Sequence, residues 1–151
     1  MLKVATWNVN SLNVRLPHVL AWCAEAQPDI LGLQETKLVD EKFPVQELED
    51  AGYHVAFSGQ PTYNGVALLS RKGPAEDVVK DIPGLDDPQR RIIAGTFGGL
   101  RVINLYVVNG KEVGSDKYEY KLHWLERVTD WISGEMERHE QVVVMGDFNI
   151  A

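Results

Sequence analysis

The sequence of 151 residues contains a single cysteine, which excludes a disulfide bond within the chain. Cys23 lies in a helical apolar stripe, and this position favours a core thiol over a nucleophile. No apolar run approaches the roughly 20 residues that a membrane span needs. The first residues run straight into a strand pattern, without the features of a signal peptide. We therefore expect a cytoplasmic protein with no membrane partner.

The chain is also poor in basic residues, with 15 lysines and arginines against 22 acidic residues and a net charge of −7. This balance argues against a general binder of polyanions, so any nucleic-acid partner requires a local basic face. Neither a glycine-rich phosphate loop of the Walker type nor a Cys/His cluster for zinc is present. Without repeats or linkers, a chain of this length predicts one globular domain, which buries roughly 70% of its unfolded surface.

The last apolar run, residues 142–145, is typical of a strand that is buried on both faces. Asp147 and Asn149 follow it at a spacing of two, so an extended backbone would point both side chains to one side. A carboxylate and an amide placed in this way can hold and aim a water molecule. Asp and Asn also favour turns, and from these residues alone both interpretations stay open.

Polar residues follow other predicted strands as well. Glu35 ends a strand expected over residues 30–34, where it is either an ordinary solvent-facing carboxylate or a ligand for a hard cation. Tyr106 lies near the end of a strand expected over residues 100–107, either as a core tyrosine or as a phosphate contact. If the strand ends gather on one rim, that rim holds six polar residues: Asn8, Asn10, Glu35, Tyr106, Asp147 and Asn149.

This oxygen-rich set suits Mg²⁺, or Mn²⁺ as a substitute, and the four histidines fall outside it. A bound Mg²⁺ neutralises a phosphodiester and stabilises the leaving alkoxide. Asp147, with Asn149 as the orienting group, can then position and deprotonate an attacking water. The pattern therefore indicates metal-assisted hydrolysis of a phosphate ester.

The expected elements alternate in type through the chain. Helices are predicted over residues 15–27, 44–51 and 116–139, where apolar residues recur at helical spacing. Further strands are predicted over residues 2–9, 53–57, 65–70 and 90–97, and Gly98-Gly99 is expected to form a two-residue hairpin turn. The element order indicates an α/β protein whose mixed sheet carries helices on one face.

Six motifs follow one another through essentially the whole chain. They are Trp7-Asn-Val-Asn-Ser-Leu12 with Arg15, Leu33-Gln-Glu-Thr-Lys37, Tyr63-Asn-Gly-Val-Ala67, Arg90-Arg91, Asn104-Leu-Tyr-Val-Val-Asn-Gly110 and Gly146-Asp-Phe-Asn-Ile150. In this order they resemble the motifs of the exonuclease III family. That family is the bacterial AP endonuclease branch of the endonuclease/exonuclease/phosphatase superfamily.

The resemblance implies a four-layer αββα sandwich with two packed mixed sheets, as in the deoxyribonuclease I-like fold. It also implies a Mg²⁺-dependent DNA repair nuclease that cuts double-stranded DNA 5′ to abasic (AP) sites and trims 3′ ends. By resemblance, Glu35 is a metal ligand with Asn8 beside it, and Tyr106 touches the scissile phosphate. Asp147 and Asn149 activate and position the water.

The resemblance and the distribution of basic residues also indicate where DNA is held. Asn10 and Lys37 are expected to bind the substrate, and Arg90 is expected to face the DNA. Lysines and arginines that neutralise phosphates release counterions, so DNA binding should depend steeply on salt. The candidates for this role are Arg15, Arg90, Lys117 and Lys121.

One departure from the family pattern is large, because the chain stops two residues after Asn149. We therefore expect residues 1–151 to be the N-terminal portion of a single domain whose C-terminal half is absent. The resemblance implies that this half supplies a further aspartate, a Ser-Asp-His segment and most of the second sheet. The chain alone is then expected to be inactive and to self-associate through an exposed sheet face.

Two other functions stay open. One is a non-catalytic nucleic-acid-binding or assembly module that has kept the fold and lost the chemistry. The other is a phosphatase or phospholipase of the same superfamily. Intact Glu35, Tyr106, Asp147 and Asn149 argue against lost chemistry.

Overall fold

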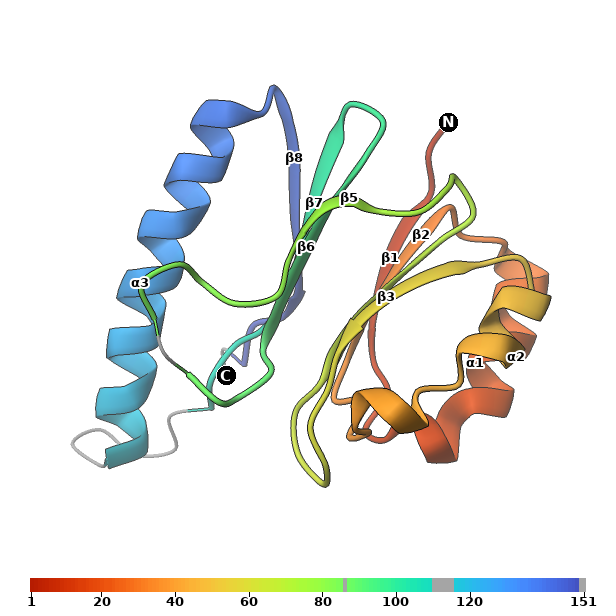
Figure 1. The fold of residues 1–151 in the computed structure, drawn as a ribbon, viewed down its shortest axis with the longest axis horizontal. Helices are drawn as coiled ribbons and strands as arrows, with labels where there is room; N and C mark the ends of the chain where they lie inside the picture. The colour runs from red at the N-terminus through yellow and green to blue at the C-terminus, as the bar shows by residue number, and fades with distance from the viewer. Residues whose placement is uncertain (86, 110–115, 150–151) are drawn as a thin grey trace.

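The computed structural model describes residues 1–85, 87–109 and 116–149, and in it two β-sheets pack face to face (Figure 1). The first sheet has the strand order β1-β2-β4-β3 and the second has the order β5-β6-β7-β8. The strands of the first sheet are β1 (Val4–Asn8), β2 (Ile30–Gln34), β3 (His54–Ser58) and β4 (Val66–Ser70). Those of the second are β5 (Glu76–Val79), β6 (Ile92–Phe97), β7 (Leu100–Tyr106) and β8 (Gln141–Asp147).

Helices cover the outer face of each sheet. In Figure 1, α1 (Leu12–Ala26) and α2 (Val45–Asp50) lie on one side of the molecule and α3 (Asp116–Arg138) lies on the opposite side. A short 3₁₀ helix, Asp40–Lys42, precedes α2. The result is the four-layer αββα sandwich implied by the resemblance. The single mixed sheet inferred from element order is wrong, because order along the chain does not say which strands pair.

Each sheet contains one parallel pair, and a helix makes the crossover in both cases. β1 pairs parallel with β2 after α1, and β7 pairs parallel with β8 after α3. A parallel pair requires such a crossover, and its strands end at the same edge of the sheet. β6 and β7 form the hairpin that was expected around Gly98 and Gly99. The topology therefore carries the ends of β1, β2, β7 and β8 to defined sheet edges.

Several boundaries differ from those expected. The helix α1 begins at Leu12 rather than at residue 15, because the Ser11 carbonyl already accepts a bond from the Arg15 N–H. Strand β5 was not predicted, since its sequence, Glu-Asp-Val-Val, is largely exposed and has no apolar alternation. None of the helices in the described residues is both long enough and apolar enough to cross a membrane.

The layer between the two sheets is largely apolar. Val66 and Leu68 of the first sheet meet Ile93, Val102 and Met145 of the second in one buried cluster. The sheet face that we expected to be exposed is therefore covered within the chain, and the expectation of an open face is wrong. The reason is that β5 to β8 already form a second sheet. Self-association itself stays a prediction.

The outer cores hold the helices against the sheets. Val19 and Cys23 of α1 are buried with the first sheet, so the cysteine is the core thiol that was expected. Trp124 and Trp131 of α3 are buried against the second sheet, which confirms their role in the core. Met136 was placed on the same apolar face, but its side chain is 61% exposed.

A buried amide network joins the sheets across this apolar layer. The side-chain nitrogen of Asn104 in β7 donates to the carbonyls of Leu33 (3.0 Å) and Ala67 (2.9 Å) in the first sheet. The side-chain oxygen of Asn104 accepts a bond from Gln34 Nε2 at 2.7 Å. Gln34 Nε2 also donates to Thr6 Oγ1 at 2.8 Å. Because buried polar groups must find partners, these bonds fix the position of one sheet on the other.

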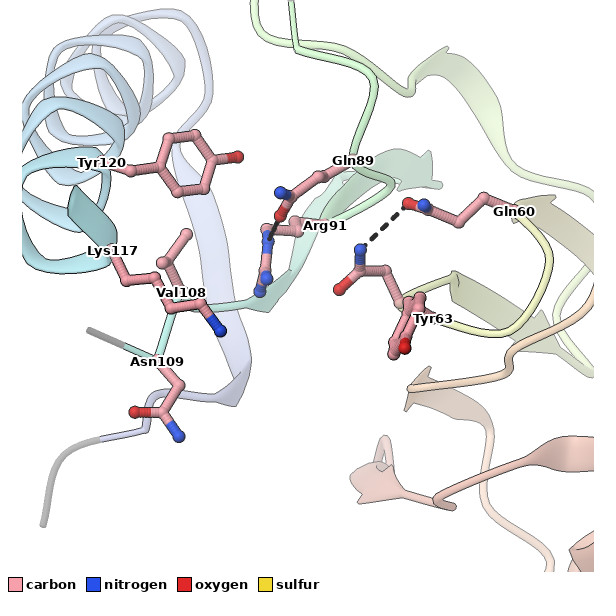
Figure 2. A pocket seen from close by; sticks show the side chains of 9 residues that line it. Gln60, Tyr63, Gln89, Arg91, Val108, Asn109, Lys117 and Tyr120 are labelled. Carbon is pink, nitrogen blue, oxygen red and sulfur yellow. Dashed lines mark hydrogen bonds between the residues drawn. The ribbon is translucent and has the colours of Figure 1, made fainter. Parts of the chain in front are cut away.

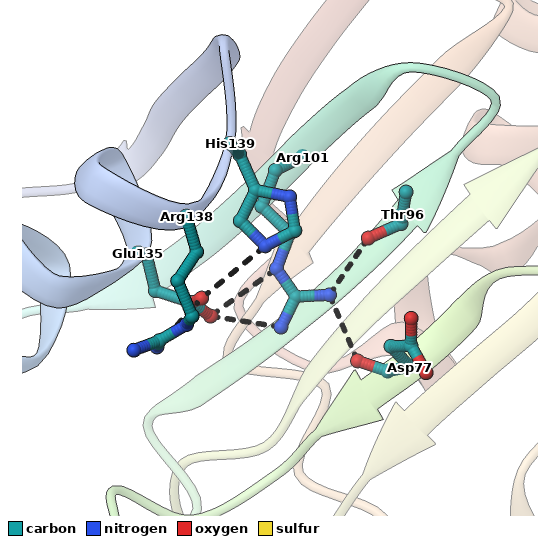
Figure 3. A network of polar contacts seen from close by, with 6 residues as sticks. All are labelled: Asp77, Thr96, Arg101, Glu135, Arg138 and His139. Carbon is teal, nitrogen blue, oxygen red and sulfur yellow. Dashed lines mark hydrogen bonds and ion pairs between the residues drawn. The ribbon is translucent and has the colours of Figure 1, made fainter.

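A second buried network anchors the C-terminal end of α3 on the second sheet (Figure 3). Glu135 Oε1 accepts two bonds from Arg101, at 2.8 and 3.2 Å, and both side chains are 3% exposed. Arg101 also donates to Thr96 Oγ1 and to the Asp77 carbonyl. Burial raises the pKa of Glu135, but the bonds and charges of Arg101 and Arg138 outweigh it and hold that pKa below its usual value.

We expect Asn104→Ala to lower the free energy of unfolding by at least about 2 kcal/mol, because it removes three buried hydrogen bonds, one from Gln34 and two to the carbonyls of Leu33 and Ala67. The Asn13→Ala control, which changes an exposed asparagine, should alter it by less than about 0.5 kcal/mol. Urea unfolding of both variants measures the difference. Equal stability of the two variants would contradict the role of Asn104 between the sheets.

Glu135→Ala should cost about 3–5 kcal/mol at pH 7, because it leaves the buried Arg101 charge without its carboxylate partner. The folded-state pKa of Glu135 is lowered, so its contribution is complete above the unfolded pKa and is lost as pH falls through the folded value. The difference in the free energy of unfolding between wild type and Glu135→Ala should therefore narrow below about pH 4. Denaturant unfolding across this pH range tests it, with the exposed Glu126→Ala as the control.

Candidate active site

Strand ends from both sheets meet at one rim. Strand β1 ends at Asn8, Glu35 directly follows β2, and β8 ends at Asp147. The side-chain nitrogen of Asn8 donates to Glu35 Oε2 at 2.6 Å and to Asp147 Oδ2 at 2.7 Å. One amide thus holds a carboxylate from each sheet, which places the two oxygens within reach of a single ligand.

The orientation of Asn8 is set by its own oxygen, which accepts a bond from the Asn10 N–H at 3.0 Å. The amide nitrogen is therefore the part that faces the two carboxylates. In this arrangement Asn8 acts as a donor that fixes Glu35 and Asp147. Its expected role as a metal ligand stays a prediction.

Tyr106 is the last residue of β7 and lies beside Asp147 in the parallel ladder. Burial raises the pKa of the Tyr106 phenol, as do the negative charges of Glu35 and Asp147 and a hydrogen bond with Glu35. The positive charge of Arg91 acts in the opposite direction without cancelling the rise. The phenol is therefore protonated at neutral pH and can donate a hydrogen bond to an anion.

Asn149 adopts a turn rather than an extended conformation, with a φ of +46°. Its backbone N–H donates to Asp147 Oδ1 at 3.1 Å, and its side-chain nitrogen donates to the Val107 carbonyl at 2.7 Å. The extended backbone considered for this pair is thus wrong, and the turn interpretation is confirmed. The turn itself fixes the Asp147 carboxylate at the rim, so turn formation and a functional role do not exclude each other.

The loops at this rim hold non-glycine residues at positive φ. Glu35 and Lys37 both have a φ of +56°, Asn10 has +45° and Ser11 has +91°. Such conformations cost free energy and persist where surrounding bonds enforce them, often at functional sites. Here the Ser11 N–H donates to the Glu35 carbonyl at 2.8 Å, which locks the two loops together.

The expected substrate-binding residues divide into two groups. Lys37 Nζ bonds Asn10 Oδ1 at 2.7 Å and lies 3.7 Å from Glu35 Oε1, so both residues belong to the rim. Lys121 of α3 donates to the Asn149 carbonyl at 3.2 Å and also reaches the rim.

Arg90 and Arg15 are not brought into this cluster. Arg90 forms an ion pair with Asp81 at 3.0 Å. Arg15 is half-buried in α1, and within the described part of the chain no polar contact joins it to Glu35 or Asp147.

Arg91 was missed by the sequence analysis, which assigned the role at this dipeptide to its neighbour. Its guanidinium lies 4.7 Å from the centre of the Tyr106 ring. It also lines a cavity of about 310 Å³ beside the rim, where Figure 2 shows it between Tyr63 on one side and Tyr120 on the other. The paired arginines were the available signal, but sequence alone does not say which one points inward.

The donor set fits a hard cation. Within the described residues no group of three or more His, Cys, Asp or Glu side chains gathers to hold a metal. Two carboxylates, Glu35 and Asp147, with a neighbouring amide are what Mg²⁺ commonly uses, because it keeps several waters and takes further oxygens from a phosphate. The rim therefore suits Mg²⁺ or Mn²⁺ better than Zn²⁺.

A model of the Endonuclease/Exonuclease/phosphatase family matches residues 5–151. The chain belongs to this family. Among curated relatives it is 36% identical to exodeoxyribonuclease III of Haemophilus influenzae, over 99% of this chain and 58% of the relative. It is 29% identical to an exodeoxyribonuclease of Bacillus subtilis, over 99% of this chain and 59% of the relative.

Solved structures of family members superimpose on the whole chain. The 3′ phosphatase NExo from Neisseria, bound to a product DNA hairpin, is 52% identical with a TM-score of 0.97, and covers 100% of this chain and 59% of that one. An AP endonuclease from Archaeoglobus fulgidus is 43% identical with a TM-score of 0.94, and the match covers 100% of this chain and 58% of that one. The resemblance and fold class are thereby confirmed, and the chain spans under two thirds of these relatives.

The metal assignment predicts that Glu35→Gln weakens Mg²⁺ binding at least tenfold, about 1.4 kcal/mol, because it removes a charged oxygen while keeping the side-chain shape. Titration calorimetry on the chain measures the affinity. The control is Glu25→Gln, an exposed glutamate of α1. Equal Mg²⁺ affinity in both variants would overturn the assignment.

Proposed function

We propose that this chain carries the metal-binding and water-activating part of a DNA repair nuclease of the exodeoxyribonuclease III and AP endonuclease type. Such an enzyme cleaves phosphodiester bonds at abasic sites in double-stranded DNA and trims 3′ ends, with Mg²⁺ or Mn²⁺ as cofactor. The observation that carries the proposal is the Asn8 bridge between Glu35 and Asp147, because it joins carboxylates from both sheets beside Tyr106.

The residues divide the chemistry between them. Glu35 would hold the cation, which when bound neutralises the phosphate and the leaving oxygen. Asp147 accepts the proton of the attacking water, and Asn149 fixes the Asp147 carboxylate through its N–H. The protonated Tyr106 donates to a phosphate oxygen. These groups work by position and charge, as phosphoryl transfer chiefly requires.

The DNA contacts are assigned to the basic and amide groups around the rim. Lys37, Asn10 and Lys121 lie at the rim, and we assign them to the phosphates next to the scissile one. Arg15 and Arg90 are proposed to contact DNA farther out, and Arg90 must release Asp81 to do so. With a net charge of −7, these few cations carry the electrostatic attraction, so binding should weaken steeply with salt.

We also propose that residues 1–151 correspond to the N-terminal portion of a single domain. The support is that relatives matching almost all of this chain extend well beyond it, with 58% of the Haemophilus influenzae protein covered. By the resemblance to exonuclease III, the portion beyond Asn149 would supply a further aspartate and a Ser-Asp-His segment. We place the protein in the cytoplasm because its cysteine is free and buried.

A second candidate is hydrolysis of a 3′-terminal phosphate on DNA. The observation in its favour is the 52% identity with a Neisseria protein that is called a 3′ phosphatase. The same groups can serve both reactions, since an activated water attacks the phosphorus atom in each of them. The intact rim disfavours a non-catalytic binding module.

The function is tested by incubating three preparations with Mg²⁺ and labelled DNA: the chain, the segment of a relative that lies outside the match, and both together. The substrates are an abasic duplex, a recessed 3′ end and a 3′-phosphate end. We expect cleavage near background for the chain alone and robust cleavage for the mixture, because each missing charge-stabilising contact costs about 10² to 10³ in rate.

Asp147→Asn in the mixture is the control, and it should abolish cleavage while leaving complex formation intact. The substrate that is cleaved separates nuclease from phosphatase activity. Cleavage of none of the three by the mixture would contradict the proposed function. Robust, Asp147-dependent cleavage by the chain alone would contradict the need for the second portion.

A further inference from the structure

Arg91 is fastened to the backbone of Tyr106 at two points. The Tyr106 N–H donates to the Arg91 carbonyl at 2.8 Å, and Arg91 Nη1 donates to the Tyr106 carbonyl at 3.1 Å. The first bond continues the sheet one residue beyond β6. The second brings the guanidinium back over the end of β7. Arg91 therefore contacts the Tyr106 backbone through both its main chain and its side chain.

The guanidinium also lies over the Tyr106 ring, 4.7 Å from its centre. Its orientation is fixed by Nε, which donates to Gln89 Oε1 at 2.6 Å, as Figure 2 shows. A planar cation held in this way restricts tilting of the phenol and attracts the ring face. The charges of Glu35 and Asp147 both act on the phenol at the other end of the ring.

We infer that Arg91 is a positioning residue for Tyr106: it clamps the ring so that the hydroxyl stays directed at the rim formed by Glu35 and Asp147. The inference rests on the proposed function, because it assigns Arg91 to the same reaction. The sequence motifs assigned the DNA-facing role at this dipeptide to Arg90, whose side chain pairs with Asp81 and lies away from Tyr106. Arg91 acts through Tyr106 rather than as a free cation for DNA.

The existing contacts of the Arg91 guanidinium support this assignment. Its Nε is bonded to Gln89, its Nη1 is bonded to the Tyr106 carbonyl and one face is covered by the ring. A phosphate that bonded Arg91 Nε or Nη1 would have to compete with these contacts. Arg91 is also half-buried, unlike the exposed Lys117 on the same cavity wall, which is the better placed phosphate contact.

The geometry also predicts that lysine cannot replace this arginine. A lysine keeps the positive charge, but its single ammonium cannot bond Gln89 and the Tyr106 carbonyl while stacking flat on a ring. Arg91→Lys therefore separates the two possible roles. A phosphate contact tolerates the change, whereas a clamp on Tyr106 does not.

The first test follows Tyr106 directly and needs no activity. The chain is labelled with 3-fluorotyrosine, and the Tyr106 ¹⁹F resonance is assigned by its loss in Tyr106→Phe. We expect Arg91→Lys to shift and broaden this resonance, while Arg127→Lys, on an exposed arginine of α3, leaves it unchanged. An unchanged Tyr106 resonance in Arg91→Lys, with the fold intact by circular dichroism, would overturn the inference.

The second test separates kcat from KM in the cleavage-competent preparation. Arg91→Lys should lower kcat about tenfold, within the range of a partly buried cation–π contact, with KM changed less than about twofold. In a Tyr106→Phe background, Arg91→Lys should cost little more, because coupled residues are not additive. A raised KM with unchanged kcat, or fully additive losses, would overturn the inference in favour of direct substrate binding.

The two arms distinguish the possible failures. If no preparation cleaves any of the three DNA substrates, the proposed function fails, and the ¹⁹F resonance still decides whether Arg91 holds Tyr106. If cleavage occurs and the resonance does not move, the function stands and the positioning role fails. Normal kinetics in Arg127→Lys confirm that loss of an arginine side chain elsewhere is not the cause.

Discussion

The buried amide of Asn104 is the contact on which the arrangement of the molecule depends. It extends from the second sheet to the carbonyls of Leu33 and Ala67 in the first, and Gln34 completes the network. Apolar packing between two sheets permits sliding, since dispersion contacts have no direction, whereas a buried donor has one satisfied position. Because Glu35 and Asp147 lie on different sheets, the site exists only when this register is kept.

The electrostatics of the rim follow from that convergence. Two carboxylates brought close together repel each other, and here the Asn8 N–H groups and Lys37 reduce the repulsion. The pair is therefore suited to a cation, and only through a cation to an anionic phosphate. This accounts for a chain of net charge −7 in a family whose relatives include a structure bound to DNA. Local charge at the rim matters more than the total.

Sequence patterns predicted most strands and all three helices to within a few residues, because burial imposes the periodicity that was used. They did not predict β5, whose exposed residues carry no such signal. They did not decide whether Asn149 belongs to a turn or to the polar rim, and in the structure it forms a turn that lies at the rim. The sequence did not single out Arg91. Two neighbouring arginines point to different sides of the chain, and only the packing of the sheet decides which one faces inward.

The sequence by itself determined the donor groups and their positions at strand ends, since hydrophobic runs locate strands and polar residues end them. It also determined the family, through motifs that keep their order along the chain. Only the tertiary structure decided that Asn8 and Asp147, which are 139 residues apart, share a hydrogen bond. It also closed the sheet face that was expected to be open. Both outcomes depend on how two sheets pack, and packing is set by side chains distant in the sequence.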